Sequence, residues 1–338
     1  MRTLLVGKRR WFSLAGALVT ILGSALAAAV GIELQPPVPL PSVAMGMKRL
    51  DLRGLPPISR YQARDGAMLA YRAYPGGREQ VVILIHGSAG QSPLMHSMAR
   101  SLQHAGATAY AVDIRGHGES GRRSDIDYIG QLDDDLADFR RYVRPAHQNA
   151  EYTLAGFSAG GAFTLRIAGG RYGDLFDRYI AIAPALTYPR GVARPNSGVW
   201  ASVSVRRIAG LMVLNWFGIH RFDGLKVTRF AAQPDDAFFT SAYSYRLTMN
   251  FSPGLDYLSF LARVKKPVAV IAGADDEQFY SDRYESLLKP VKPDIQIEIV
   301  PGVGHAGAIV APAMLETVKR VFTTPQHSRR PNGATKSE

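Results

Sequence analysis

Between residues 60 and 323, short apolar runs alternate with amphipathic segments, and this alternation limits the chain to few folds. Residues 81–85 form a continuous apolar run rich in β-branched side chains, as in a strand that is buried on both faces of a sheet. Within residues 129–143, apolar side chains recur every three or four positions, which is typical of a helix with one buried face. The alternation predicts an α/β fold with a mainly parallel central sheet and helices on both faces.

Local signals predict where further elements begin and end. The sequence Arg64-Asp65-Gly66 favours a tight turn, so residues 61–73 are expected to form a hairpin. Ser92 and Pro93 have the character of a helix N-cap and a first helical residue, which predicts a helix that ends near His104. Further strands are predicted at residues 108–114, 152–155, 179–183, 268–272 and 295–300, and further helices at residues 159–171 and 314–322.

Residues 185–256 interrupt the alternation, because they contain many aromatic side chains and an apolar run at 208–219 but no regular succession of strands and helices. We expect this segment to be an inserted, largely helical cap. The core would then consist of residues 60–184 and 257–323. Proline-rich residues near position 40 indicate a linker over residues 35–59, and the polar residues 324–338 are expected to form a disordered tail.

The N-terminal region has the composition of a membrane-directed segment. Lys8, Arg9 and Arg10 precede the uncharged, mainly apolar residues 11–32, and a helix needs about 20 such residues to cross a bilayer. Two interpretations of residues 1–34 stay open: a retained transmembrane anchor, or a signal peptide that is cleaved after the small residues 24–27. The basic cluster is expected to remain cytoplasmic, so the folded domain would be exported in either case, membrane-anchored in the first and secreted or periplasmic in the second.

The formal net charge of +12 is concentrated at the two ends of the chain. Residues 1–10 contribute four positive charges, residues 319–338 contribute a net four, and only four remain for the middle. This distribution argues against a nucleic-acid partner and suits anionic lipid headgroups near an N-terminal anchor. The chain contains no cysteine, which excludes a disulfide framework, a thiolate metal site and a cysteine nucleophile.

The sequence Gly156-Phe157-Ser158-Ala159-Gly160 lies where a predicted strand meets a predicted helix. A serine at such a junction occupies a sharp, strained turn that holds its hydroxyl above the sheet, and flanking glycines are needed because side chains would clash. The N-terminus of the following helix directs free N–H groups towards the same point. Ser158 is therefore the predicted nucleophile, with Gly156 and Gly160 as supporting residues.

A second glycine-rich loop, His86-Gly87-Ser88-Ala89-Gly90, follows the buried run at 81–85. Such a loop can offer a backbone N–H to a developing oxyanion. We assign the oxyanion hole to the N–H groups of Ser88 and Ala159. His86 and Gly87 are expected to support the loop, with His86 structural rather than catalytic.

A serine nucleophile requires a base, and the base requires an orienting acid. On this kind of sheet the order along the chain is serine, acid, histidine, and His305 is the histidine that follows a late strand in a loop of small residues. Asp275 and Asp276 both follow the strand predicted at 268–272 and are both candidates for the acid. The run Asp133-Asp134-Asp135 lies on an amphipathic helix and is predicted to be a solvated face.

Over roughly residues 60–322 the chain resembles the α/β-hydrolase superfamily, and within it the monoacylglycerol lipase and serine aminopeptidase-like branch. The resemblance rests on residues 85–87, 113–120, 156–160, 273–276 and 304–305. It implies an acid three residues after the strand-ending glycine, which selects Asp276 and leaves Asp275 as the alternative. It also implies that the turn at 113–120 is structural.

The resemblance implies a serine hydrolase that works through Ser158, His305 and Asp276 in a two-step acyl transfer, without a metal or an organic cofactor. We expect lipid-like or other apolar acyl esters as substrates, because aromatic side chains in the cap and a membrane tether would bring such molecules close. Two alternatives remain. A serine aminopeptidase or amidase would need acidic groups for the substrate ammonium, for which Asp223, Asp235 and Asp236 are candidates, and a non-catalytic binding protein could use the same fold.

Overall fold

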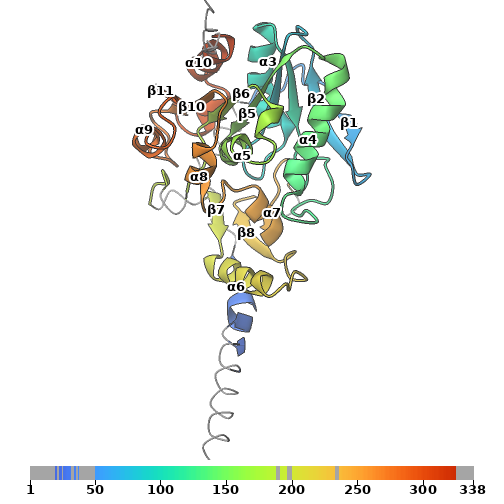
Figure 1. Ribbon diagram of the computed structural model, residues 1–338, viewed down its shortest axis with the longest axis vertical. Helices are drawn as coiled ribbons and strands as arrows, with labels where there is room; N and C mark the ends of the chain where they lie inside the picture. The colour runs from blue at the N-terminus through green and yellow to red at the C-terminus, as the bar shows by residue number, and fades with distance from the viewer. Residues whose placement is uncertain are drawn as a thin grey trace, which may run out of the picture.

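The computed structural model describes the folded domain and parts of the N-terminal region. The described residues are 20, 23–24, 26–31, 34–35, 37, 50–187, 191–195, 200–232 and 236–324. A central sheet lies between layers of helices, and a smaller cap projects from one end of it (Figure 1). The predicted α/β-hydrolase fold is confirmed.

The central sheet has eight strands in the order β1-β2-β4-β3-β5-β6-β10-β11. The six strands from β4 to β11 in this order pair in parallel, and β2 pairs antiparallel with both β1 and β4. The mainly parallel sheet and the N-terminal hairpin were both predicted. The strands are β1 Ser59–Gln62, β2 Met68–Tyr74, β3 Gln80–Ile85, β4 Thr108–Val112, β5 Glu151–Phe157, β6 Arg178–Ile182, β10 Val268–Gly273 and β11 Gln296–Val300.

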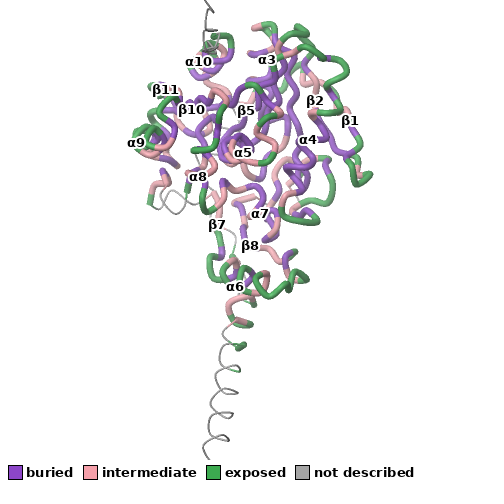
Figure 2. Tube along the Cα trace, viewed as in Figure 1, coloured by how far each residue is buried: buried purple, intermediate pink, exposed green. Residues whose placement is uncertain are grey.

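Helices cover both faces of this sheet, and Figure 2 shows the buried strands between them. Successive residues of β3 point into different cores: Ile83 packs with α4, α5 and α8, whereas Leu84 packs with α3 and α10. Burial on both faces explains why this strand is apolar throughout. The helices of the core are η1 Ser92–Met95, α3 His96–His104, α4 Gln131–Val143, η2 Arg144–Ala146, α5 Ala159–Ala168, η3 Gly173–Leu175, α8 Tyr257–Ala262, α9 Arg283–Leu288, η5 Ala306–Ile309 and α10 Pro312–Thr323.

The helix after β3 begins differently from the prediction. Gln91 occupies the N-cap position, and Ser92 is the first residue of a 3₁₀ turn that precedes α3. The Ser92 N–H donates to the Asp113 carboxylate at 2.6 Å, so this backbone is held by the neighbouring strand loop rather than by a cap. The predicted end of the helix at His104 is confirmed.

The cap is not largely helical, contrary to the prediction. It contains a three-stranded antiparallel sheet in the order β7-β8-β9, with two helices beside it. Strands this short, paired between segments far apart in the sequence, leave no periodic signal for a helix or strand prediction to detect. The elements are β7 Ala201–Val203, α6 Val205–Trp216, β8 Lys226–Phe230, β9 Ala242–Ser244 and α7 Tyr245–Asn250.

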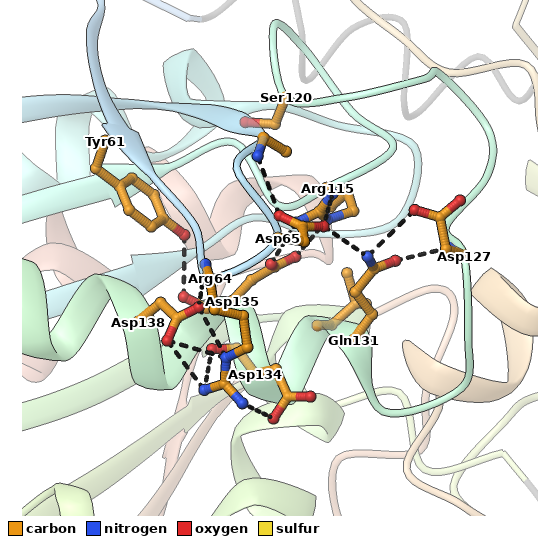
Figure 3. Close-up of polar contacts among 12 residues, drawn as sticks. Tyr61, Arg64, Asp65, Arg115, Ser120, Asp127, Gln131, Asp134, Asp135 and Asp138 are labelled. Atoms are coloured by element: carbon orange, nitrogen blue, oxygen red, sulfur yellow. Dashed lines mark hydrogen bonds and ion pairs between the residues drawn. The ribbon is translucent and has the colours of Figure 1, made fainter.

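The aspartates of α4 do not form a solvated face, which corrects a second prediction. Asp133, Asp134, Asp135 and Asp138 are all buried, and we call them the aspartate cluster. Figure 3 shows that the partners of three of them come from elements outside α4. The carboxylates bind arginine side chains as follows: Asp133 with Arg166, Asp134 with Arg64 and Arg171, Asp135 with Arg115, and Asp138 with Arg64 and Arg141.

The predicted N-terminal hydrophobic helix at 11–32 lies largely outside the described residues. Within the described part of the chain, no helix combines the length and apolar character that crossing a membrane requires. Residues 26–31 are helical and lie against the cap, where the Arg207 guanidinium donates to the Val30 carbonyl at 2.7 Å. Of the predicted linker, residues 50–59 lie on the core, and of the predicted tail only Thr324 is described.

Candidate active site

Ser158 lies at the turn between β5 and α5, and its backbone is strained. Its φ and ψ angles are 54° and −116°, a conformation that non-glycine residues rarely adopt. The neighbouring glycines make the turn possible: a Cβ on Gly156 would lie 2.2 Å from the Gly160 carbonyl oxygen, and one on Gly160 would lie 2.4 Å from that of His86. At both positions a side chain would collide with backbone atoms, so this turn requires glycine on both sides of Ser158.

The structure brings the predicted base and acid to this serine. His305 Nε2 lies 3.0 Å from Ser158 Oγ, and His305 Nδ1 lies 2.8 Å from Asp276 Oδ2. Asp276 is fully buried, and its other carboxylate oxygen accepts the backbone N–H groups of Gln278 and Phe279 at 2.8 and 2.9 Å. Asp275, the alternative acid, is exposed and does not contact His305.

The His305 imidazole is held by apolar and polar neighbours. The rings of Phe157 and Phe279 flank it, with centroids 5.0 and 4.9 Å away. Glu277 accepts the His305 backbone N–H at 2.9 Å, so it fixes the loop that carries the imidazole. Glu277 was not predicted, although its position directly after the two candidate acids was a signal for it.

The loop at residues 86–90 is held by its own histidine. Because the Ile114 N–H donates to His86 Nε2 at 3.3 Å, the proton lies on Nδ1, which donates to the Gly87 carbonyl at 2.8 Å. Burial lowers the pKa of His86 and keeps it neutral. Both of these hydrogen bonds join His86 to backbone groups.

A cap residue that was not predicted also holds this loop. The Ala89 N–H donates to the Tyr243 hydroxyl oxygen at 2.5 Å, and the Thr240 N–H donates to the Ala89 carbonyl at 2.8 Å. The Tyr243 hydroxyl in turn donates to His117 Nε2 at 2.6 Å. Burial, together with the neighbouring His86, lowers the pKa of His117 well below its ordinary value, so the imidazole stays neutral and can accept this proton. Ala89 has a positive φ of 62°, and cap contacts on both sides of its peptide hold it there.

Ser158 and His305 open into a small cavity of about 60 Å³ between core and cap. Trp200 and Phe239 form its cap side, and the Trp200 indole N–H donates to Ser88 Oγ at 3.2 Å. No carboxylate is among the described residues that line this cavity. The lining residues are Gly87, Ser88, Leu94, Phe157, Ser158, Trp200, Phe239, Gln278, His305, Ala306 and Ile309.

The predicted oxyanion donors lie beside this cavity. Ser88 lines it directly, and Ala159 is the first residue of α5, where a backbone N–H has no partner within the helix. Among the described residues, no group of three or more histidine, aspartate or glutamate side chains is arranged to bind a metal ion.

A serine on a strained strand-to-helix turn above a mainly parallel sheet, next to a histidine and an aspartate, defines the α/β-hydrolase class. The sequence profile of one family in this class, described as serine aminopeptidase S33, matches residues 76–308. The match covers more than half of the chain, and the protein belongs to this family.

Two relatives match a smaller part of the chain and less than half of their own length. A monoacylglycerol lipase of Mycolicibacterium smegmatis is 32% identical over 116 residues, which cover 33% of this chain and 40% of the lipase. An esterase of Mycobacterium tuberculosis is 38% identical over 115 residues, which cover 34% of this chain and 35% of the esterase. The crystal structure of a monoacylglycerol lipase of Paleococcus ferrophilus shares the fold, with a TM-score of 0.57 and 21% identity over 75% of this chain and 96% of that one.

Proposed function

We propose that this protein is a serine hydrolase that cleaves carboxylic esters through Ser158, His305 and Asp276. The observation that carries the proposal is the unbroken line of hydrogen bonds from Asp276 through His305 to Ser158, which ends at an apolar cavity. The monoacylglycerol lipase and the esterase that match part of the chain support an ester as the substrate.

In the first step, Ser158 Oγ attacks the ester carbonyl carbon while His305 Nε2 accepts the hydroxyl proton. The carbonyl oxygen becomes an oxyanion, which accepts hydrogen bonds from the N–H groups of Ser88 and Ala159. The carbon–oxygen bond to the alcohol then breaks, and His305 returns its proton to the leaving alkoxide. The acyl group remains on Ser158.

In the second step, water attacks the acyl-enzyme, and His305 accepts a proton from it. Collapse of the second tetrahedral intermediate returns the proton to Ser158 and releases the carboxylic acid. Asp276 accepts the Nδ1–H of His305, which leaves Nε2 free to accept a proton and stabilises the imidazolium that forms. Two backbone N–H groups hold this carboxylate in place.

The environment of the cavity favours an apolar acyl ester over the aminopeptidase alternative. An aminopeptidase would need a carboxylate beside the substrate ammonium, and none of the described cavity residues supplies one. Asp223 is buried and binds Asn215, and Asp236 accepts the N–H groups of Phe238 and Phe239. Asp235, the third candidate, lies outside the described residues.

A fluorophosphonate probe tests the nucleophile, and a substrate panel tests the acyl class. The wild-type protein should be labelled, and Ser158→Ala should not. p-Nitrophenyl esters from acetyl to palmitoyl should be hydrolysed in preference to aminoacyl p-nitroanilides. Absence of wild-type labelling would favour a non-catalytic binding protein, and turnover of the anilides alone would favour an aminopeptidase.

We also propose that residues 1–34 direct the domain to the membrane, as a retained anchor or as a cleaved signal peptide. The proposal rests on the uncharged residues 11–32 and the basic cluster before them. N-terminal sequencing of membrane-fraction protein separates the two cases, since a mature chain that starts near Ala28 has lost the segment.

A further inference from the structure

The outward face of α6 is unusually apolar for a helix at the surface of a cap. Val205, Met212, Val213 and Trp216 recur with helical spacing along it, and Phe217 follows directly. The exposed fractions of Val205, Trp216 and Phe217 are 72%, 86% and 74%. Figure 2 shows the exposed side of this helix at the end of the cap that lies away from the core.

The opposite face of α6 is also apolar and supplies the packing that holds the helix on the cap. Leu211 is fully buried against Val227 and Tyr245. A helix that packs by one face ordinarily presents polar residues on the other. The outward apolar side chains are therefore not needed to fold the cap, and a patch of this kind marks an interaction surface.

The charge around this face favours an anionic partner. From Val203 to Arg221 the sequence contains no acidic residue, whereas Arg206 and Arg221 are exposed. An apolar stripe bordered by arginines is the pattern of a helix that lies in the interface of an anionic membrane. Trp216 is the residue type that is enriched where headgroups meet acyl chains.

The N-terminal segment reaches the folded domain at this same helix. A Cβ on Gly210 would lie 2.9 Å from the Val30 side chain and 3.3 Å from that of Leu26, so the absence of a side chain lets the segment approach closely. In Figure 1 the described N-terminal helical residues lie directly beside α6, at the opposite end of the molecule from α10. Residues 26–30 therefore lie against the same helix that carries the outward apolar face.

We propose that the outward face of α6 docks on the interfacial region of a lipid bilayer that contains anionic headgroups. Trp216 and Phe217 enter the boundary between headgroups and acyl chains, and Arg206 and Arg221 lie among the phosphates. The docking fixes which end of the domain faces the membrane, whether or not residues 1–34 are retained. This surface is separate from Ser158 and its cavity, so it goes beyond the proposed function.

The experiment uses the natural absence of cysteine. Phe217→Cys in the full-length chain is labelled with an environment-sensitive fluorophore and mixed with vesicles of phosphatidylcholine, with or without phosphatidylglycerol. Some of the vesicles carry nitroxide groups shallow in the acyl chains as quenchers. Glu316→Cys, at an exposed site on α10, is the matched control.

The label at position 217 should move to a more apolar environment and lose roughly half of its emission to the nitroxides, more strongly with phosphatidylglycerol. The label at position 316 should stay in water. A second substitution, Trp216→Ser, should weaken the quenching at 217, and hydrolysis of p-nitrophenyl acetate should be unchanged by any of these substitutions. A failure of the docking proposal is thus distinguishable from a failure of the proposed function.

Three results would overturn the proposal. The label at 217 could remain unquenched on vesicles that carry the protein. Labels at 217 and 316 could be quenched equally, which would mean association without a preferred face. The label at 217 could become buried without lipid as the protein concentration rises, which would assign the face to a second copy of this chain.

Discussion

The buried carboxylates of Asp276 and Asp135 are both held by hydrogen bonds of 2.7 to 2.8 Å, but their partners differ. Asp276 binds His305, and Asp135 binds Arg115. An imidazole can gain or lose a proton near neutral pH, whereas a guanidinium keeps its charge. The imidazole beside Asp276 also has a free second nitrogen directed at a serine, whereas the guanidinium beside Asp135 binds a second carboxylate, that of Asp65.

The difference teaches that burial of a carboxylate does not by itself indicate chemistry. In the aspartate cluster each carboxylate holds two elements together: Asp135 ties α4 to the loop after β4, and Asp133 ties α4 to α5. At the candidate active site the carboxylate holds a group that can move a proton. Substitutions at the first place should therefore change stability, and substitutions at the second should change turnover.

The largest effect is expected for Ser158→Ala. Removal of the hydroxyl leaves His305 without a proton to accept, so kcat for a p-nitrophenyl ester should fall by about 10⁶-fold. The unfolding midpoint should change little, because the substitution leaves no large cavity. Ser286→Ala, at an exposed hydroxyl on α9, is the control and should retain full activity. Substantial turnover by Ser158→Ala would mean that Ser158 is not the nucleophile.

The next effect is expected for Asp276→Asn. An amide in place of the carboxylate favours the wrong imidazole tautomer, so kcat should fall by about 10⁴-fold with little change in KM. Asp275→Asn is a matched control, because the neighbouring residue is exposed and does not contact His305. Steady-state kinetics on both variants decides between the two aspartates, and a larger loss for Asp275→Asn would reverse the assignment.

In the aspartate cluster, Asp135→Asn should lower the free energy of unfolding by about 3 kcal/mol, because it leaves the buried Arg115 with one carboxylate instead of two. kcat should remain within about twofold of wild type once the protein is folded. Urea titration measures the first quantity. Glu298→Gln breaks an exposed pair with Arg320 and should cost only about 0.5 kcal/mol. A loss of kcat in Asp135→Asn without a loss of stability would contradict a purely structural role for the aspartate cluster.

The sequence was sufficient to predict features that depend on residues close together along the chain. Gly156, Ser158 and Gly160 form one turn, and the strand before them and the helix after them are both visible as patterns. Asp275 and Asp276 follow the buried strand β10, and His305 follows β11, so all three became candidates because parallel strands end at the same edge of a sheet. The choice of Asp276 over Asp275 came from the family resemblance.

What the sequence did not reveal depends on partners that are distant along the chain. Asp133 is 33 residues from Arg166, and Asp135 is 20 residues from Arg115, so nothing near the helix indicated that its charged face was buried. A run of aspartates with helical spacing is ordinarily solvated, and the prediction followed that rule. Tyr243 was missed for the same reason, since it contacts Ala89 across 154 residues.

Tyr243→Phe tests whether the cap supports the candidate active site. Loss of the hydroxyl leaves the buried Ala89 N–H without its acceptor, so the loop that carries the Ser88 N–H should become less well held and kcat should fall by about tenfold. KM should stay close to the wild-type value, because the hydroxyl does not line the cavity. Tyr152→Phe also loses one buried hydrogen bond, to the His147 carbonyl, and should affect stability alone. Equal kinetic losses in both variants would mean that Tyr243 acts only through stability.

The smallest effect is expected for a substitution of Asp125. Its buried carboxylate binds Arg246 of the cap, so it joins core and cap as the aspartate cluster joins elements of the core. Burial tends to raise the pKa of Asp125, but hydrogen bonds from Arg246 and Ser244 outweigh burial and lower the pKa from 3.8 to about 2. Because the pKa in the folded state is below that in the unfolded state, the contribution of Asp125 to stability is complete above pH 3.8 and is lost as the pH falls towards 2.

The difference in unfolding free energy between wild type and Asp125→Asn should therefore be largest near neutral pH, about 1 kcal/mol, and should shrink at about pH 3. Urea titrations of both proteins at the two pH values give this difference directly. If the difference were the same at both pH values, Asp125 would stabilise the protein through its hydrogen bonds and not through its charge. The amide of asparagine would then replace those hydrogen bonds only in part. A difference that grew in acid would contradict the direction of the pKa shift at Asp125.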